Sequence, residues 1–296
     1  MIKNLLRQTS VIFLLALVFA FVSPGFSTTV DDYLTPLLIV AMTFSIVEVK
    51  FDLHTFIKGK AYLARAFFFN YVVCTGVTLL LTYLLIQDPD TFKGMVLFAS
   101  IPSAVGVLSY SKILKGNGEY VLNGQIILYL ASLVLMPLIV YSILGTSVDT
   151  SKLVESLFLM ILLPLIFSRI VRRMNIKNLA EYEKIIINIA FFFVFYAVLG
   201  PNMDKLVLSS LTIALFMVFF FRKFIVGTIV FFADRYLKVP KDIAVDDVLF
   251  STYKNEGLAV ALAMALAGPV AVFPGAIVTI VSVFLFIYLE QMFKMY

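Results

Sequence analysis

The sequence predicts an all-α membrane protein with ten transmembrane helices, and three observations carry that prediction. Of the 296 residues, 62% are hydrophobic and 14% are charged, whereas soluble domains are about 45–50% apolar and about 25% charged. A water-soluble globule of this composition would expose large apolar patches. Apolar stretches long enough to cross a bilayer recur along the whole chain, and basic residues collect at alternate connections between them.

The apolar stretches define the predicted helices. A helix needs about 20 mainly apolar residues to cross a hydrocarbon core of about 30 Å. Such stretches lie at 9–24, 33–49, 61–86, 94–114, 119–145, 152–172, 184–200, 205–232, 244–267 and 270–293. The short connections leave no room for a soluble domain, so we expect 1–296 to form a single transmembrane transporter domain. Residues 1–22 resemble a signal peptide without a good cleavage site, and we interpret them as an uncleaved first helix.

The basic residues predict the orientation. Cytoplasmic loops collect Lys and Arg, and 19 of the 23 basic residues lie on one side of the ten spans, with three on the other. We therefore expect both termini in the cytoplasm, in a prokaryotic plasma (inner) membrane. The asymmetry explains the net charge of +5 without a nucleic-acid partner. One Cys and one His exclude a disulfide framework and a metal site built from these residues.

Three basic residues lie inside predicted spans instead of between them. Lys254 lies inside the ninth span, and Arg222 and Lys223 lie inside the eighth. For Arg222 and Lys223 we expect a long helix whose basic side chains extend to the membrane interface.

A short sequence match indicates an internal repeat. Segments 96–103 (VLFASIPS) and 248–255 (VLFSTYKN) begin with the same three residues and lie 152 positions apart, which is close to half of the chain. Each falls on the fourth helix of a five-helix half, about 1–146 and 147–296. Because each half has an odd number of helices, the halves must be inverted relative to each other, as in many secondary transporters.

Both matched segments carry residues that interrupt a membrane helix. Pro102 lacks an amide donor and clashes with the preceding helical turn. The tetrad 254–257 places two charges in the ninth span, and a charge at the bilayer centre costs at least ~2.5–3.5 kcal/mol. Matching interruptions in two halves indicate a transport site. The predicted site residues are Pro102, Ser103, Ala104, Lys254, Asn255, Glu256 and Gly257. The alternatives are a kink without function at Pro102 and a structural ion pair between Lys254 and Glu256.

Several motifs, in order along nearly the whole chain, carry a family resemblance. They are 42–45 (MTFS) leading into 51–52 (FD), 101–103 (IPS), 113–117 (ILKGN), and 254–259 (KNEGLA) with the later prolines at 269 and 274. In this order and spacing the chain resembles the bile acid:sodium symporter family. The resemblance implies two inverted five-helix repeats, with broken helices 4 and 9 crossing in a core domain beside a panel domain. It also implies two sodium ions behind the crossing, an organic anion between the domains, and transport by alternating access.

The departures from the family pattern fall on the sodium sites that the resemblance implies. Val107 and Leu108 stand where the family has a Ser-Asn pair, Phe250 stands for a Glu, and Lys254 stands for a Gln, while Asn70 keeps an amide on helix 3. Sodium needs several hard oxygen ligands, and here some are lost and an ammonium is added.

We therefore expect the Lys254 ammonium to occupy the place of a sodium ion, with Asn255, Glu256 and carbonyls of the broken helices as its partners. Transport would then be proton-coupled through Lys254 or Glu256, or uncoupled. The alternative is a sodium site formed by Glu256, Asn255 and Asn70. No cofactor is expected beyond Na⁺ or H⁺ as a coupling ion.

The expected partners are the lipid bilayer and a small organic anion. Half-helix N-termini attract carboxylates, and Lys254 would reinforce them. A cation/proton antiporter or an auxin-efflux-like carrier would need a paired acidic site, whereas only Glu256 is placed in the core by the sequence. An intramembrane enzyme or a receptor is a remote alternative, because no acidic pair, His cluster or nucleophile motif is present.

Overall fold

The protein is described by a computed structural model. It covers residues 6–47 except 8, 60–174 except 105, 176, 179–203 except 202, and 209–296. Every regular element in these ranges is a helix or helical turn, and they contain no strand. The all-α prediction is therefore confirmed for the described part of the chain.

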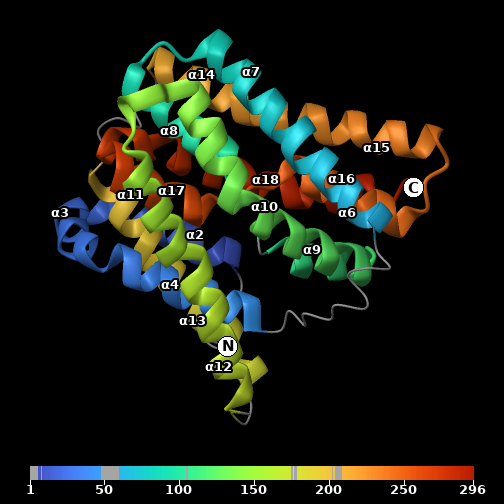
Figure 1. Cartoon of the computed structure of the whole chain (residues 1–296), viewed down its shortest axis with the longest axis horizontal. Helices are drawn as coiled ribbons and strands as arrows, with labels where there is room; N and C mark the ends of the chain where they lie inside the picture. Colours follow the sequence, from blue (N-terminus) through green and yellow to red (C-terminus); the bar gives the residue numbers. More distant parts are fainter. Residues whose placement is uncertain are drawn as a thin grey trace.

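The described helices follow one another along the chain (Figure 1). The first half contains α2 (Thr9–Val22), α3 (Pro24–Ser27), η1 (Thr28–Tyr33), α4 (Leu34–Val47), α6 (Lys60–Phe67), η2 (Phe68–Thr75), α7 (Gly76–Leu85), α8 (Pro89–Ser100), α9 (Val107–Leu114) and α10 (Gly118–Leu144). The second half contains η3 (Gly145–Ser147), α11 (Thr150–Leu157), η4 (Phe158–Leu162), α12 (Leu163–Arg173), α13 (Leu179–Leu199), α14 (Ser210–Phe220), η6 (Phe221–Ile225), α15 (Val226–Tyr236), α16 (Lys241–Thr252), α17 (Glu256–Ala267), η7 (Pro269–Val272) and α18 (Phe273–Met292).

Five helical runs in the described ranges are long and apolar enough to cross a membrane. They are Ala61–Leu85, Gly118–Ser147, Ser151–Arg173, Ser210–Tyr236 and Val270–Met292. These runs correspond to the third, fifth, sixth, eighth and tenth predicted spans. The fourth and ninth spans are absent from this set because each is divided into two shorter helices.

The divided spans have matching geometry. Helices α8 and α16 each have 12 residues, and their first residues, Pro89 and Lys241, are 152 positions apart (241 − 89). This is the separation of the sequence match. Residues 101–104 and 106, and residues 253–255, then lie outside the α-helices before α9 and α17 begin. The two interruptions predicted from the sequence are present.

The sequence supplies local start signals for these helices. The Asp88 side chain accepts a hydrogen bond from the Thr91 amide (2.7 Å), and Pro89 follows it in the first turn of α8. At α17, the Asn255 side chain accepts from the Leu258 amide (3.1 Å). Such caps satisfy amides that have no partner within the helix. Helix α8 therefore begins at a defined residue before the predicted fourth span, and α17 begins at a defined residue inside the ninth.

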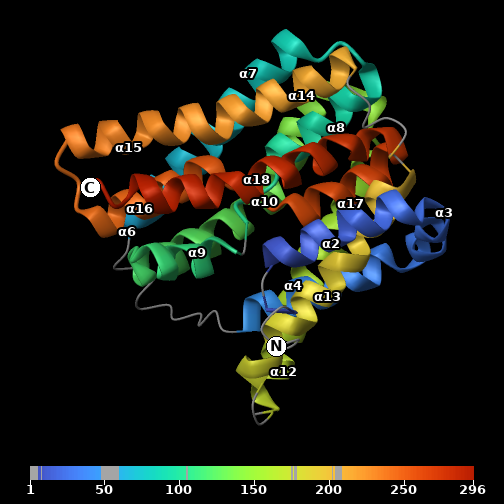
Figure 2. The same ribbon diagram turned by 180° about the vertical axis from the view of Figure 1, so that it is seen from behind.

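The helices gather in two groups (Figures 1 and 2). In the first bundle, α13 packs against α2 and α4, and α12 packs against α4. In the second bundle, α10 packs against α6 and α8, α17 against α8, α16 against α9 and α15, and α14 against α7 and α18. Helices α13 and α4 also contact α17, so the second half of the divided span 241–267 faces the first bundle.

Candidate functional site

The two interruptions contact each other inside the second bundle. The Asn255 backbone amide donates a hydrogen bond to the Pro102 carbonyl oxygen (3.0 Å). Pro102 follows the end of α8, and Asn255 is the cap residue of α17. The ends of four half-helices therefore meet in a small region of the bundle.

The Lys254 side chain lies at this meeting point and is fully buried. Its ammonium donates hydrogen bonds to Asn70 Oδ1 (3.0 Å), Thr75 Oγ1 (2.8 Å) and the Ile101 carbonyl oxygen (2.8 Å). It also lies 4.8 Å from the centre of the Tyr71 ring, in the range of a cation–π contact. Because a lysine ammonium has three donors, its hydrogen-bonding capacity is fully used.

Three of the groups around Lys254 come from the π-helical segment η2. It carries Asn70, Tyr71 and Thr75, and π-helical turns within α-helices occur frequently at functional sites. The Asn70 amide group donates to the Phe250 carbonyl oxygen (3.1 Å), which leaves Asn70 Oδ1 to accept from Lys254. The third oxygen belongs to Ile101, the C-terminal cap residue of α8. The ammonium therefore lies at the negative end of the α8 dipole.

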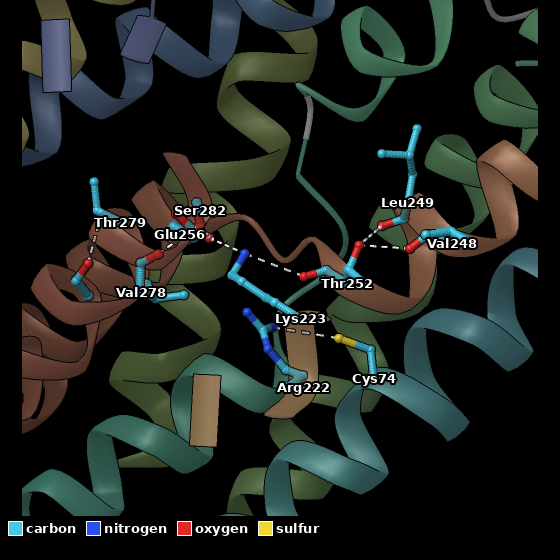
Figure 3. Close-up of polar contacts among 11 residues, drawn as sticks. Cys74, Arg222, Lys223, Val248, Leu249, Thr252, Glu256, Val278, Thr279 and Ser282 are labelled. Carbon is cyan, nitrogen blue, oxygen red and sulfur yellow. Dashed lines mark hydrogen bonds and ion pairs between the residues drawn. The ribbon is translucent and has the colours of Figure 1, made fainter. Parts of the chain in front are cut away.

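The predicted partners of Lys254 were partly wrong. A broken-helix carbonyl does accept from its ammonium, but Asn255 and Glu256 do not. Glu256 Oε1 instead accepts from Lys223 Nζ (2.9 Å) and from Ser282 Oγ (2.6 Å). Lys254 reaches the Ile101 carbonyl oxygen at the end of α8. Glu256 instead faces Lys223 of η6 and Ser282 of α18 (Figure 3). The alternative of a structural ion pair between Lys254 and Glu256 is therefore wrong.

Arg222 and Lys223 are fully buried, so the expectation that they extend to the membrane interface is wrong. Both belong to the π-helical turn η6 in the middle of the run Ser210–Tyr236, which lies beside α16 and α18. The Lys223 ammonium reaches Glu256 and also donates to the Thr252 carbonyl oxygen (3.4 Å). The sequence signal for the burial of Arg222 and Lys223 was their position deep within an apolar run.

The Arg222 guanidinium is held mainly by apolar and aromatic groups. It lies over the rings of Phe98 (5.1 Å) and Phe219 (5.4 Å). Its Nη1 atom donates to Cys74 Sγ (3.6 Å). Its Nε and Nη2 atoms have no hydrogen-bond partner among the described residues. The core thus contains a guanidinium that no described carboxylate neutralises.

The three residues of the alternative sodium site hold different partners. Asn70 binds Lys254, and Glu256 binds Lys223 and Ser282. The Asn255 amide group donates to Tyr129 Oη (2.7 Å) and contacts Met42 Sδ (3.2 Å). Across the described ranges, no group of three or more His, Cys, Asp or Glu side chains is arranged to hold a metal ion.

Apolar side chains fill another position where the resemblance implies sodium ligands. Val107 and Phe250 are fully buried and belong to one apolar cluster. The Phe250 ring packs against the Tyr120 ring (5.4 Å between centres), and a side chain at Gly124 would collide with it. Val107 and Phe250, which stand at positions where the resemblance implies sodium ligands, are therefore packed among apolar side chains.

A cavity of about 300 Å³ lies between the two bundles. Of the predicted site residues, it is lined by Ala104, Lys254, Asn255, Glu256 and Gly257. Pro102, Ser103 and Asn70 lie behind it, and the Ser103 hydroxyl is buried without a hydrogen-bond partner among the described residues. On the opposite wall, the exposed Lys184 of α13 supplies a cation. The cavity therefore lies between α4, α9, α13 and α17 and has polar side chains in its lining.

A second charged cluster lies away from this cavity. Asp234, Asp246 and Asp247 are buried, so the expectation that Glu256 is the sole acid in the core is wrong. Arg65 pairs with Asp247 and, at 3.5 Å, with Asp234. Tyr120 Oη donates to Asp247 Oδ1 (2.6 Å). These contacts tie α6, α10, α15 and α16 together, which is a structural role.

Comparison with known proteins agrees with this architecture. The family model described as "Sodium Bile acid symporter family" matches residues 35–209, which is more than half of the chain. The match includes Asn70, Thr75 and Pro102, and it ends before η6 and the divided helix α16–α17. No curated protein matches the chain significantly. Members of this family are transporters, and the chain is therefore an integral membrane protein that belongs to the sodium bile acid symporter family.

Proposed function

We propose that the protein is a secondary transporter that moves a small organic anion by alternating access without requiring sodium. The observation that carries this proposal is the Lys254 ammonium, which is fully buried and bound by three oxygen atoms at 2.8–3.0 Å. An amide, a hydroxyl and a carbonyl oxygen are hard ligands of the kind that bind sodium. The ammonium supplies the positive charge that they require.

In this proposal the chain forms ten transmembrane helices in two inverted repeats. Three features support it: the equal lengths of α8 and α16, their separation of 152 residues, and the π-helical turns η2 and η6 in the helices that precede them. The second bundle is then the core domain, and the first bundle is the panel domain. We also propose a prokaryotic plasma (inner) membrane as the location, with both termini in the cytoplasm.

The substrate would bind in the cavity between the two bundles. Helix α17 begins at the cavity wall, and the N-terminal end of a helix favours a carboxylate. The expectation that Lys254 reinforces this site is not supported, because its three donors are used inside the core. Lys184, across the cavity, is the exposed cation that can contact an anion.

The alternative coupling mechanism uses sodium bound at Glu256. The contacts of Glu256 with Lys223 and Ser282 argue against it, since the carboxylate already has a cation and a hydroxyl. Proton coupling or uncoupled transport is therefore the favoured form of the proposal. The paired acids Asp234 and Asp247 favour a cation/proton antiporter as the second candidate, but Arg65 neutralises part of their charge.

Thermal unfolding of the purified protein in detergent tests the proposal, with sodium replaced by choline at constant ionic strength. A ligand at 100 times its dissociation constant stabilises the folded state by ~2.7 kcal/mol. We expect no sodium-specific stabilisation of the natural sequence and a clear one in Lys254→Ala, where the three oxygens lose their ammonium. Sodium dependence of the natural sequence that persists in Lys254→Gln would contradict the proposal. A series of mono- and dicarboxylic acids, tested in the same assay, would identify the substrate class.

A further inference from the structure

A lysine ammonium lies at the C-terminal end of the first half of each divided helix, α8 and α16. Lys254 binds the carbonyl oxygen of Ile101 at the C-terminal end of α8. Lys223 binds the carbonyl oxygen of Thr252, the last residue of α16. Each ammonium therefore lies at the negative end of a half-helix dipole, where a cation is stabilising.

The surroundings of the two ammonium groups are also alike. Lys223 Nζ lies 4.6 Å from the centre of the Tyr253 ring, as Lys254 Nζ lies 4.8 Å from that of Tyr71. Both lysines are fully buried. They differ in their oxygen partners: Lys223 has two, one of them the acidic Glu256 (2.9 Å), whereas Lys254 has three neutral ones.

The oxygens around Lys223 form a compact ligand set. Glu256 Oε1 accepts from both Lys223 Nζ and Ser282 Oγ, and the Thr252 carbonyl oxygen completes the group. Figure 3 shows the ammonium between Glu256 and Thr252, with Ser282 on the far side of the carboxylate. A carboxylate, a hydroxyl and a carbonyl oxygen are ligands that a hard cation accepts. Glu256 and Ser282 also line the cavity, so an ion could reach this position from there.

We propose that Lys223 is a second built-in cation and that its ammonium fills a latent site for a monovalent metal ion formed by Glu256, Ser282 and Thr252. This inference rests on the proposed function. There, the Lys254 ammonium takes the place of a sodium ion at the end of α8, and here the Lys223 ammonium takes the place of a metal ion at the end of α16. The C-terminal end of each first half-helix, α8 and α16, is then bound by an ammonium that comes from another element of the chain. Glu256 serves as the fixed counter-ion of Lys223.

Removing the side chain of Lys223 tests the proposal directly. Thermal unfolding of Lys223→Ala is measured in detergent with sodium, potassium or choline at constant ionic strength. We expect a sodium- or potassium-specific rise of the midpoint by about 5 °C or more, and no such rise for the natural sequence. The matched control is Lys223→Met, which keeps the volume of the side chain and should leave no space for an ion. Lys223→Ala with Glu256→Gln should lose the metal-ion response.

The outcomes separate this proposal from the proposed function. A metal-ion response in Lys254→Ala but none in Lys223→Ala would overturn the second cation site and leave the proposed function standing. Sodium stabilisation of the natural sequence would contradict sodium independence, and the latent site would then be supported only by a larger metal-ion response in Lys223→Ala than in the natural sequence. If Lys223→Ala does not fold in choline, the yield of folded protein in sodium decides. Recovery in sodium supports the proposal, and equal loss in both salts contradicts it.

Discussion

Lys254 donates a hydrogen bond of 2.8 Å to the carbonyl oxygen of Ile101, so the connection before α17 supplies a cation to the end of α8. Without a cation or donor, the terminal carbonyls of a buried half-helix would be unsatisfied. The contact also joins the two divided helices, in addition to the backbone hydrogen bond between Asn255 and Pro102. The charge of Lys254 and the stability of the contact between the two divided helices are therefore linked.

We predict that Asn70→Leu lowers stability by about 1–3 kcal/mol, because it removes one acceptor from a buried ammonium and the donor to the Phe250 carbonyl. Thermal unfolding in detergent measures the change. In a Lys254→Met background the same substitution should cost less, since the two residues interact directly and their effects are not additive. Equal costs in both backgrounds would show that Asn70 acts without Lys254.

We predict that Glu256→Gln destabilises the protein by about 3–5 kcal/mol, because it leaves the buried Lys223 ammonium without its carboxylate. Combining it with Lys223→Met should recover most of the loss. Thermal unfolding of the two single variants and the double variant provides the measurement. A double variant less stable than Glu256→Gln alone would mean that Lys223 does not depend on this ion pair.

Several features of this site could be predicted from the sequence because their causes are local. Pro102 lacks an amide donor, and the charges at 254 and 256 cannot face lipid, so both positions had to interrupt a span. The separation of 152 residues between the matched segments also reappears in the first residues of α8 and α16. The position of Lys254 between polar groups followed from its depth in the span.

The partners of the buried charges could not be predicted in the same way. Asn70 and Thr75 come from η2, about 180 residues before Lys254 along the chain, and a π-helical turn has no clear signature in an apolar run. The long basic side chains of Arg222 and Lys223 could have reached either the interface or the core. Tertiary packing directs both side chains into the core. As a result, Glu256 accepts a hydrogen bond from Lys223 and not from Lys254.

Arg222 should behave differently from its neighbour. Because its Nε and Nη2 atoms have no hydrogen-bond partner among the described residues, Arg222→Met removes a buried charge that no described carboxylate neutralises. We predict unchanged stability or a gain of about 1–3 kcal/mol, whereas Lys223→Met should destabilise. Thermal unfolding of the two variants under identical conditions tests this contrast. A large loss for Arg222→Met would indicate an essential electrostatic role for the guanidinium.

Gly257 allows the two bundles to approach each other. A methyl group at this position would lie 2.8 Å from the Phe191 ring of α13 and 3.5 Å from Leu38 of α4. Overpacking of this kind costs about 1–3 kcal/mol, and it acts on the contact between the bundles rather than on the fold of either one. We predict that Gly257→Ala lowers roughly tenfold the population of the conformation in which α17 contacts α13 and α4. The cavity should then be more open.

Cysteine accessibility measures this shift without knowledge of the substrate. Ser109 lines the cavity, and the native Cys74 is buried, so a water-soluble thiol reagent should report on Ser109→Cys. We expect faster modification when Gly257→Ala is added. Gly76→Ala is the matched control, because a methyl group there meets no atom within 4 Å, and it should leave the rate unchanged. Equal modification rates with and without Gly257→Ala would show that α17 and α13 do not separate at this position.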